Sequence, residues 1–324
     1  MPRIALISEL HANYEALKAA VEDIRQNEDI RQIFCLGDFV GYGPDPNKVV
    51  ETIKALEDEG YEIRNNIGNH DAAAIGRCNF VDLNNEEEYQ RVLEEGGFES
   101  KIDILKAYRD PETRKYIPVK TEGKLAIDWT INQLTPENLN YLETRLEELV
   151  EIMPGVIAVH ASPRDTIFEY VRDKATAQKC FESPEMNDVQ ICFHGHTHVA
   201  VTWILKAEER MSYGDSIIVM DEPAEVHENF FELDLNQNLY LINVGAVGQP
   251  RGKDRRPTFV IFDTDASTVE FRKVDYDWST TQAKILDAGL PESLAGRLAM
   301  RDSVGETPEA DVEDIPEADV EEVE

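Results

Sequence analysis

Short apolar runs and amphipathic stretches alternate along the first part of the chain. Residues 3–8 form an apolar run that suits a buried strand, and residues 14–25 carry apolar side chains every three or four positions. That spacing predicts an amphipathic helix with Asn13 as its N-cap. The chain is therefore expected to start with a strand that is followed directly by a helix.

The alternation continues over the next segment of the chain. A second strand is predicted at residues 33–36 and a third at residues 62–65. Between them, Asp45 and Pro46 open a helix, since proline is well tolerated in a first turn. The third strand leads into the polar residues 68–71. Strands that alternate with helices predict an α/β sheet whose functional groups lie at the strand ends.

From residue 82 to residue 123 the pattern loosens into a charged stretch with helical patches. We interpret residues 82–123 as an insertion over the core, either a lid or a plain solvated excursion. After it, the residues Thr135, Pro136 and Glu137 start a helix that is predicted to run to about Leu149.

The second half of the chain is richer in short strand patterns. Apolar strands are expected at residues 155–159 and 189–193, and helix is expected again between residues 280 and 301. Further strands are predicted at residues 216–220, 239–244, 258–262 and 268–272.

The end of the chain has a different composition. The hexapeptide PEADVE occurs twice, and residues 302–324 contain eleven carboxylates with no Lys, Arg or aromatic residue. Such a segment cannot bury enough apolar area to offset the entropy of ordering it. We therefore predict one domain over residues 1–301 and a disordered acidic tail over residues 302–324. A docking role for the tail is a further hypothesis.

Composition narrows the class of protein. With 324 residues, 42% of them apolar, the chain is long enough for one large domain or two ordinary ones. It contains no apolar run of roughly 18 residues, so no transmembrane helix and no membrane association are expected. The N-terminus lacks a cleavable signal pattern, and the four cysteines are scattered, as is typical of reduced thiols. We expect a soluble, cytoplasmic protein.

The net charge of −33 bears on the partners. Nucleic-acid binding depends on Lys and Arg side chains that displace counterions from phosphates, so a nucleic acid is a disfavoured partner and a nuclease a disfavoured function. A small phosphoester stays compatible with this charge, because bound cations can reverse the field inside one cleft.

Five of the seven histidines follow apolar runs, each within a polar cluster: His11, His70, His160, His196 and His198. His194 belongs to the last cluster and His227 stands apart. One such histidine alone is more often structural, but here each cluster adds a carboxylate or an amide. Imidazole nitrogen, carboxylate oxygen and amide oxygen are the ligands of borderline and hard divalent cations. The pairs Glu9/His11 and His196/His198 are two residues apart, so at a strand end both members face the same way.

The residues around these histidines form recognisable motifs. ISELHAN, GDFVGYGPDP, GNHD, VHASPRD and GHTH closely resemble the five-motif signature of the calcineurin-like metallophosphoesterases. AIDWTINQLTPENLNYL and INVGAVGQPR look like a bacterial and archaeal subgroup of phosphodiesterases and phosphatases in that superfamily. The resemblance extends from Pro2 to about Met300, but it is poor over residues 82–123 and in the tail. It implies an α/β sandwich of two mixed β-sheets flanked by helices, with metals at the strand ends.

The resemblance also implies roles for single residues. Glu9, His11, Asp38 and His198 would surround a first metal, and Asp38 would bridge to a second metal held by Asn69, His160 and His196. The metals would be manganese or, as alternatives, iron, zinc, cobalt or nickel. His70 would lie beside the substrate and either stabilise the phosphoryl group or protonate the leaving oxygen. Two cations about 3.5–4 Å apart can bind a phosphoryl oxygen and generate a bridging hydroxide that attacks phosphorus.

Three neighbouring features leave alternatives open. Asp71 either orients His70 through a hydrogen bond or caps the helix that follows. Arg164 either contacts the substrate phosphate or braces its loop. The GQPR segment at residues 248–251 is expected to form a turn near the metals, and that turn could be purely structural.

The first motif departs from the resemblance, which would place Asp where this chain has Glu9. The carboxylate of Glu reaches further by about one C–C bond, whereas metal–ligand distances are held to about ±0.2 Å. Either the longer side chain folds back and ligates, or the first metal is bound more weakly or through water. We hypothesise a working site with reduced affinity for the first metal. The alternative is an impaired or non-catalytic metal-binding scaffold protein.

The second motif bears on the substrate. Protein serine/threonine phosphatases of the superfamily carry an arginine soon after the Gly-Asp pair, and this chain has none between Asp38 and Val50. We therefore expect two-metal hydrolysis of a small-molecule or nucleotide phosphoester, a monoester or a diester, rather than of a phosphoprotein.

Overall fold

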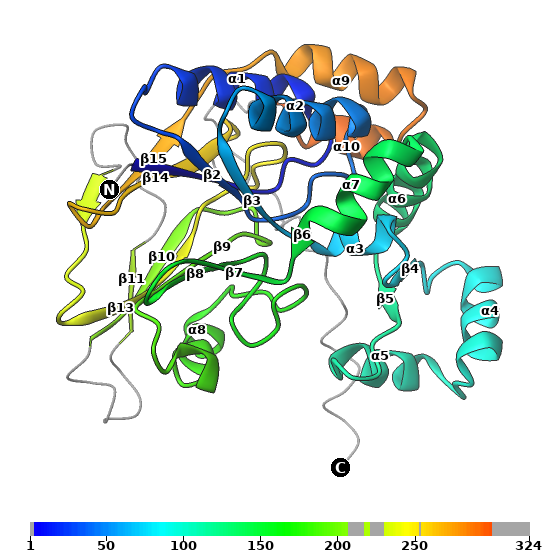
Figure 1. The fold of residues 1–324 in the computed structure, drawn as a ribbon. Coiled ribbons are helices and arrows are strands. Elements are labelled where there is room, and N and C mark those ends of the chain that lie inside the picture. The colour runs from blue at the N-terminus through cyan, green and yellow to red at the C-terminus, as the bar shows by residue number, and fades with distance from the viewer. Residues whose placement is uncertain (1–2, 207–216, 221–229, 253, 300–324) are drawn as a thin grey trace, which may run out of the picture.

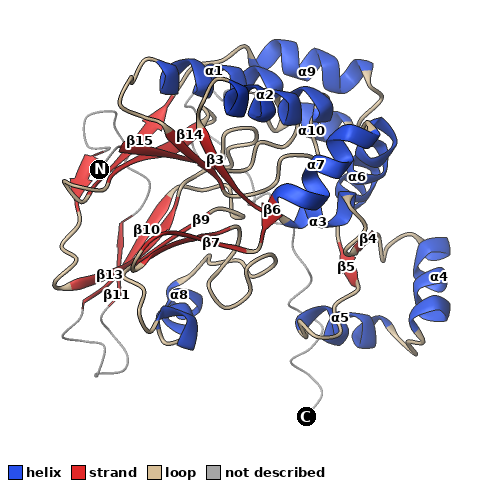
Figure 2. Cartoon of the chain, in the orientation of Figure 1, coloured by secondary structure: helices blue, strands red, loops and turns tan. Residues whose placement is uncertain are grey.

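Two β-sheets face each other in the computed structural model, which describes residues 3–206, 217–220, 230–252 and 254–299. The larger sheet has the strand order β12-β15-β14-β1-β2-β3-β6, and the smaller has the order β11-β10-β13-β9-β8-β7. Helices lie outside this pair of sheets (Figures 1 and 2). The predicted α/β sandwich of two mixed sheets is confirmed.

The larger sheet is parallel on one side and antiparallel on the other. Its parallel strands are β1 (Arg3–Ile7), β2 (Gln32–Cys35), β3 (Glu62–Asn66) and β6 (Leu146–Glu147). Its antiparallel strands are β14 (Thr258–Asp263), β15 (Thr268–Lys273) and β12 (Phe230–Glu232).

The smaller sheet also mixes both directions. Strands β8 (Val156–Val159), β9 (Ile191–His194) and β13 (Asn238–Asn243) run parallel to one another. Strands β7 (Leu149–Met153), β10 (Val201–Lys206) and β11 (Ile217–Met220) pair antiparallel to their neighbours.

The two faces of the larger sheet are buried in two different cores. Side chains alternate between the two faces of a strand, and along β1 they sort accordingly. Ile4 and Leu6 enter the core between the sheets, where Phe193 lies. Ala5 and Ile7 point to the other side and join the core beneath the helices. This double burial explains why the strand is apolar at every position after Arg3.

Most helices cover the outer face of the larger sheet or its ends (Figure 1). They are α1 (Tyr14–Arg25), α2 (Pro46–Asp58), α3 (Asn69–Ala74), α6 (Thr121–Gln133), α7 (Pro136–Arg145), α9 (Trp278–Asp287) and α10 (Glu292–Gly296). Helix α8 (Lys174–Phe181) and the 3₁₀ turn η1 (Pro184–Met186) lie against the smaller sheet, where Phe181 and Met186 are buried. The side chain of Asn13 accepts from the N–H of Ala16 and caps α1, as predicted.

A small unit lies beside the sandwich, below α3 and α6 in Figure 1. It contains β4 (Asn79–Val81), α4 (Glu86–Gly96), α5 (Lys101–Arg109) and β5 (Tyr116–Pro118). This unit differs at both ends from the predicted segment 82–123, since β4 begins at Asn79 and α6 already begins at Thr121, and we call residues 79–118 the insertion. It has its own apolar cluster, which includes Val81, Val92 and Ile104. The segment is thus packed rather than a plain solvated excursion, and its function as a lid stays a prediction.

One predicted helix is shorter than expected, because α7 ends at Arg145 and not near Leu149. The next residues enter β6 and β7, in which Leu146 and Val150 are buried beside exposed glutamates. Leu146 pairs with Asn65 of the larger sheet, and β7 pairs with β8 of the smaller. These pairings between distant segments override the helical propensity of a Glu- and Leu-rich stretch.

One helix was not predicted, and two of the sequence features fall outside the described residues. Helix α8 was not predicted, because its sequence shows only a weak amphipathic pattern. The tail at residues 302–324, together with His227, lies outside the described residues. Within the part of the chain that the structure describes, no helix is both long and apolar enough to cross a membrane.

Candidate metal centre

The predicted site residues follow five strands whose carboxyl ends meet at one edge of the sandwich. Glu9 and His11 follow β1, Asp38 follows β2, and Asn69 and His70 follow β3. His160 directly follows β8, and His196 and His198 follow β9. Parallel strands place their carboxyl ends at the same edge, which brings these residues together. All eight are buried: Glu9, His11, Asp38, Asn69, His70, His160, His196 and His198.

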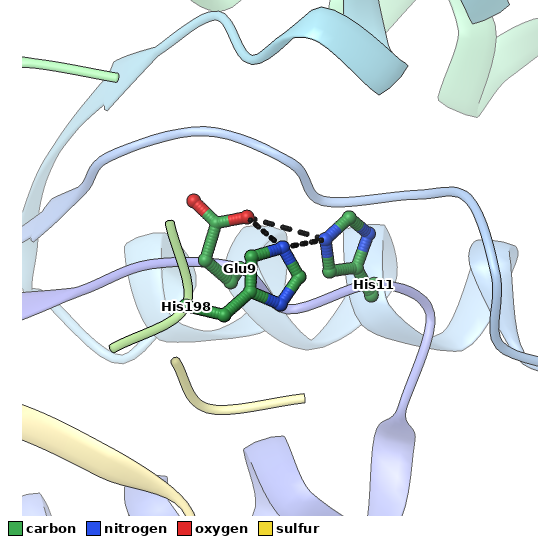
Figure 3. A group of neighbouring side chains, drawn as sticks. All are labelled: Glu9, His11 and His198. Atoms are coloured by element: carbon green, nitrogen blue, oxygen red, sulfur yellow. Dashed lines mark hydrogen bonds and ion pairs between the residues drawn. The ribbon is translucent and has the colours of Figure 1, made fainter. Parts of the chain in front are cut away.

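A first group contains Glu9, His11 and His198 (Figure 3). Glu9 Oε2 lies 3.0 Å from His198 Nε2 and 3.2 Å from His11 Nε2. The two Nε2 atoms lie 3.1 Å apart. Three ligand atoms therefore converge on one point from two distant segments of the chain.

A second group contains Asp38, His160 and His196. His160 Nε2 lies 3.1 Å from His196 Nδ1 and 3.2 Å from Asn69 Oδ1. Asp38 Oδ2 lies 3.7 Å from His160 Nε2 in this group and 3.5 Å from His11 Nε2 in the first. Asp38 is thus the residue that lies between the two groups, in the position predicted for a bridging ligand.

Four imidazole rings are oriented by backbone carbonyl groups. His11 Nδ1 donates to Val40 O at 3.1 Å, His160 Nδ1 to Leu36 O at 2.8 Å, His198 Nδ1 to Gln249 O at 2.7 Å, and His196 Nε2 to Phe168 O at 3.3 Å. A carbonyl oxygen can only accept, so the proton must lie on the nitrogen that faces it. The other nitrogen of each ring then presents a lone pair to the centre of the site, as is typical of metal-binding histidines.

The lone pairs explain why cations fit here. Burial lowers the pKa of His11, His160, His196 and His198, so these rings are neutral at neutral pH. Two neutral rings that face each other through lone pairs 3.1 Å apart cannot hydrogen-bond. Metal–nitrogen bonds of about 2.0–2.1 Å place neighbouring ligands about 3 Å apart. The spacing therefore matches that of two ligands of one cation.

The backbone at the site is strained. Left-handed φ values occur at Glu9 (55°), His11 (42°), Asp38 (54°), His196 (65°) and His198 (61°). Such a conformation at a non-glycine residue costs on the order of 1–3 kcal/mol, and it persists where the surrounding structure determines it. Five strained residues within one ligand set indicate that the sandwich stabilises a functional geometry.

Glu9 is accommodated by a neighbouring glycine. Its Oε1 atom accepts from the N–H of His196 at 2.7 Å and from Ser8 Oγ at 2.9 Å, which leaves Oε2 to face the rings. A Cβ atom at Gly195 would lie 2.7 Å from Oε1 and 2.2 Å from Ser8 Oγ. The two hydrogen bonds that Oε1 accepts favour the ionised carboxylate. Of the two ways to absorb the extra methylene, the geometry favours direct ligation.

Asp38 is held by the loop after β3. Its Oδ1 atom accepts from the N–H of His70 at 2.9 Å, and a Cβ at Gly68 would lie 2.0 Å from that oxygen. Burial, together with the charges of Glu9 and Asp71, raises the pKa of Asp38 well above its usual value. Carboxylates this close and this buried need compensating positive charge, which divalent cations supply.

His70 is positioned by packing. Its ring lies 4.3 Å from the Tyr42 ring and 4.9 Å from the rings of Phe80 and His11, measured between centroids. Within the described residues, its buried Nδ1 has no hydrogen-bond partner. Nδ1 faces Gly41, where a Cβ would lie 2.3 Å from it. Although His70 was not predicted as a ligand, its ring is also close to His11 and Asp38.

Asp71 bonds to the backbone. Its Oδ1 atom accepts from the N–H of Phe39 at 2.9 Å, and Oδ2 accepts from the N–H of Gly68, the N-cap of α3, at 3.1 Å. Burial raises its pKa to about 7. No hydrogen bond from Asp71 to the His70 ring is found among the described residues. These contacts favour the capping alternative, and a catalytic role for Asp71 stays a prediction.

The contacts of Arg164 and Arg251 differ from those that their motifs suggested. Arg164 pairs with Glu169 at 3.1 Å, which favours the loop-bracing alternative. Arg251, in the GQPR segment, donates its backbone N–H to His198 O at 3.1 Å, and its guanidinium carbon lies 5.9 Å from the centroid of the Tyr42 ring. After burial, its charge is the largest cause that lowers the pKa of His198, to about 3. The motif itself was the signal that could have identified Arg251.

His194 does not join the ligand groups. Its Nδ1 atom lies 3.3 Å from the side-chain nitrogen of Asn243, and burial lowers its pKa to about 4. His194 is still within β9, whereas His196 and His198 lie in the loop beyond it. Of the three histidines in the cluster, only the latter two turn towards the centre.

Comparisons with known proteins agree with this geometry. The calcineurin-like phosphoesterase family matches residues 2–200. The uncharacterized protein MJ0912 of Methanocaldococcus jannaschii is 31% identical over 298 residues, which are 91% of this chain and 96% of that protein. The crystal structure of a metallophosphoesterase from Sphaerobacter thermophilus is 35% identical, with a TM-score of 0.64 over 91% of this chain and 98% of that one.

A further structure supports the fold alone. The hypothetical protein PH1004 of Pyrococcus horikoshii OT3 is 17% identical, with a TM-score of 0.62 over 92% of this chain and 98% of that one. The family implies divalent metal ions, and the two ligand groups are where such ions would bind. The chain belongs to the calcineurin-like phosphoesterase family.

Proposed function

We propose that the protein hydrolyses a small-molecule phosphoester in a site that holds two divalent cations. The observation that carries this proposal is the orientation of four buried imidazole rings, each with one nitrogen on a backbone carbonyl and the other facing the ligand groups. Membership of the family and the likeness to the Sphaerobacter thermophilus metallophosphoesterase support it.

The ligands divide between the two cations as the groups suggest. Glu9, His11 and His198 would hold the first, Asn69, His160 and His196 the second, and Asp38 would contact both. Manganese is our first candidate, with iron, zinc, cobalt and nickel as alternatives, because mixed nitrogen and oxygen ligands suit them all. When bound, the cations supply Lewis-acid activation of a water molecule and of a phosphoryl oxygen.

His70 is our candidate for contact with the phosphoryl group. Burial lowers its pKa well below the usual value, so the ring is neutral. A neutral ring is a poor proton donor to a leaving oxygen but can donate a hydrogen bond to a phosphoryl oxygen. Since Nδ1 faces Gly41, we assign that hydrogen bond to Nε2.

Arg251 is our candidate for charge stabilisation at the first ligand group. Its backbone N–H donates to His198 O, and its guanidinium group lies over the Tyr42 ring. Arg164, by contrast, forms an ion pair with Glu169. Arginine binds phosphate well because its planar fork of donors matches two oxygens at once.

The substrate class follows from charge and sequence. A net charge of −33 disfavours nucleic acids and leaves a small monoester or diester, and the lack of an arginine after the Gly-Asp pair disfavours phosphoproteins. A cytoplasmic location is part of the proposal, supported by four buried, free cysteines. We propose no membrane contact.

The test uses metal-stripped protein before and after addition of manganese. We expect hydrolysis of p-nitrophenyl phosphate or of bis(p-nitrophenyl) phosphate only after the addition, and its loss in His70→Ala. The preferred ester would assign phosphatase or phosphodiesterase activity. Folded protein that binds manganese at both groups yet turns over neither ester would instead support the non-catalytic scaffold.

A further inference from the structure

The loop after β9, residues 195–198, carries one histidine of each ligand group, and we call it the ligand loop. His196 belongs to the second group and His198 to the first. Both residues have left-handed φ values, 65° and 61°. Such values are costly at non-glycine residues and persist only where the surrounding structure determines them. Contacts from outside the ligand loop therefore have to hold it in this conformation.

His196 is the central residue of a three-residue turn within the ligand loop. The N–H of Thr197 donates to Gly195 O at 2.8 Å, and this hydrogen bond closes the turn around His196. A turn of this kind with a positive φ at its centre is the rare and strained form. The turn determines where the His196 ring lies, with its Nδ1 atom 3.1 Å from His160 Nε2.

Asn243 contacts both ends of this turn. Its Nδ2 atom donates to Gly195 O at 2.5 Å and to Thr197 Oγ1 at 3.0 Å. An asparagine amide has two N–H donors, so these two contacts use both of them. The same nitrogen lies 3.3 Å from His194 Nδ1, at the end of β9. One fully buried side chain thus spans the turn from its first residue to its last.

The partners of Asn243 fix the orientation of its amide. Gly195 O can only accept a hydrogen bond, so the amide nitrogen has to face it. The N–H of Gly245 can only donate, and it lies 3.0 Å from Asn243 Oδ1. This oxygen therefore bonds to the backbone of its own segment, and Asn243 acts on the site through the ligand loop. Aspartate would keep the acceptor but lose both donors.

The sheet explains why Asn243 lies beside the ligand loop. Asn243 is the last residue of β13, which runs parallel to β9, and its Cα partner is His194. Parallel strands end at the same edge of a sheet, so the end of β13 lies next to the loop that leaves β9. Two residues after Gly245 the chain reaches the loop after β1, where the N–H of Gly248 donates to Glu9 O at 2.7 Å.

We propose that Asn243 is a positioning residue, which holds the strained turn around His196 and thereby determines the affinity of the second ligand group for its cation. The segment INVGAVGQPR then has a role in the site besides forming a turn. The proposal rests on the proposed function, because it assumes that the second ligand group holds a cation. It does not depend on hydrolysis.

The test measures manganese binding by calorimetry. We expect Asn243→Ala to lower the affinity of the second ligand group by about 10–100-fold, the range for residues that orient metal ligands. A double-mutant cycle shows whether the effect passes through His196, since coupled residues are not additive. In a His196→Ala background, Asn243→Ala should lower the affinity little further. An equal further loss in that background would overturn the proposal.

Thr197 offers a graded comparison. Thr197→Val removes the hydroxyl group that accepts from Asn243 and keeps the shape of the side chain. It should lower the affinity by less than Asn243→Ala does, because the hydrogen bond to Gly195 O is kept. Thr197→Ser retains the hydroxyl group and should restore the affinity. If Thr197→Ser and Thr197→Val had equal effects, the contact between Thr197 and Asn243 would not hold the turn, and the proposal would be overturned.

Asn138→Ala is the matched control. Asn138 is a buried asparagine whose amide nitrogen also donates twice, to Asn47 Oδ1 at 2.9 Å and to Glu51 Oε1 at 3.3 Å. These contacts join α7 to α2 and involve no candidate ligand, so the manganese affinity should stay unchanged. If Asn138→Ala lowered it as much as Asn243→Ala, the effect would be general destabilisation, and the proposal would be overturned.

A measurement on metal-free protein separates this proposal from the proposed function. The N–H of Thr197 is hydrogen-bonded within the turn, so Asn243→Ala should increase its hydrogen exchange by about tenfold and leave that of β1 unchanged. Faster exchange at Thr197 would support the role of Asn243 even in a protein that binds no manganese, an outcome that would count against the proposed function. Unchanged exchange at Thr197 would overturn the role of Asn243, whatever the metal content.

Discussion

The metal centre and the insertion lie next to each other, but the chain builds them in opposite ways. The metal centre collects buried polar side chains from segments between Glu9 and His198, and five of its residues have left-handed backbone. The insertion is one continuous segment, residues 79–118, around an apolar cluster that includes Val92 and Ile104. One region depends on the whole sandwich, and the other depends mainly on itself.

The difference has an energetic consequence. Neutral imidazoles and carboxylates buried without a cation destabilise the fold, and the backbone strain adds to this cost. Cations bound there would therefore stabilise the folded state as well as supply the proposed chemistry. The insertion has no such cost, since burying an apolar side chain stabilises by about 1.5–3 kcal/mol. At the candidate metal centre, the residues needed for function destabilise the metal-free fold. In the insertion, the buried apolar residues stabilise it.

The largest effect is expected for Asp38→Asn. Loss of residues that only orient metal ligands typically costs about 10–100-fold, so loss of a carboxylate between both groups should reduce manganese-dependent turnover by more than about 100-fold. The amide keeps the acceptor for the N–H of His70 and removes a buried charge. In metal-free protein the unfolding temperature should therefore not fall. A lower unfolding temperature of metal-free Asp38→Asn than of the metal-free unmodified protein would contradict the inference that these buried carboxylates destabilise the fold without a cation.

A smaller effect is expected for Glu9→Asp. The shorter carboxylate cannot reach both the N–H of His196 and the rings of His11 and His198, so affinity for the first metal should fall by about 10–100-fold. The metal content per chain after dialysis, measured by mass spectrometry, gives the readout. Higher occupancy in this variant would instead support the hypothesis that Glu9 weakens the first site.

A matched pair of core substitutions tests the independence of the insertion. Ile104→Ala and Ile242→Ala each remove a fully buried isoleucine and should each cost about 2–5 kcal/mol. Ile242 lies between the two sheets, so its loss should lower the global unfolding temperature. Ile104→Ala should increase hydrogen exchange within residues 79–118 and leave the metal content unchanged. Loss of metal in Ile104→Ala would show that the two regions fold as one unit.

The smallest effect is expected for Arg164→Ala. An exposed ion pair such as Arg164–Glu169 contributes about 0–1 kcal/mol, so kcat/KM should change by no more than about twofold. Arg251→Ala is the comparison, and it should reduce kcat/KM by about tenfold or more because a hydrogen bond to a charged group is lost. Equal effects of the two substitutions on kcat/KM would support the alternative that Arg164 contacts the substrate phosphate.

Much of the fold was readable from local pattern. The strand at residues 3–8, the helix after Asn13 and the strands after residue 238 recur within a residue or two of their predicted ends. The end of α7 was not readable, because residues 146–153 become strands only by pairing with β3 and β8. A local pattern cannot report a partner that lies far away in the sequence.

The candidate site divides in the same way. The motifs named Glu9, Asp38 and the histidines, because residue types that bind cations follow predicted strands there. They did not show that Gly195 makes room for the carboxylate of Glu9, or that Arg251 faces the site while Arg164 pairs with Glu169. These are distances between segments, and only packing sets them.

By itself, then, the sequence determined the chemistry available to this protein. Residue types, their spacing after apolar runs and the charge of the chain are local properties, and they suffice to indicate a family and a ligand set. The tertiary structure decided which nitrogen of each ring faces inward, because the carbonyl groups of Val40, Leu36, Gln249 and Phe168 come from other segments. It also decided that Asn243 contacts both ends of the turn around His196, because contacts between distant segments arise only when their strands pair.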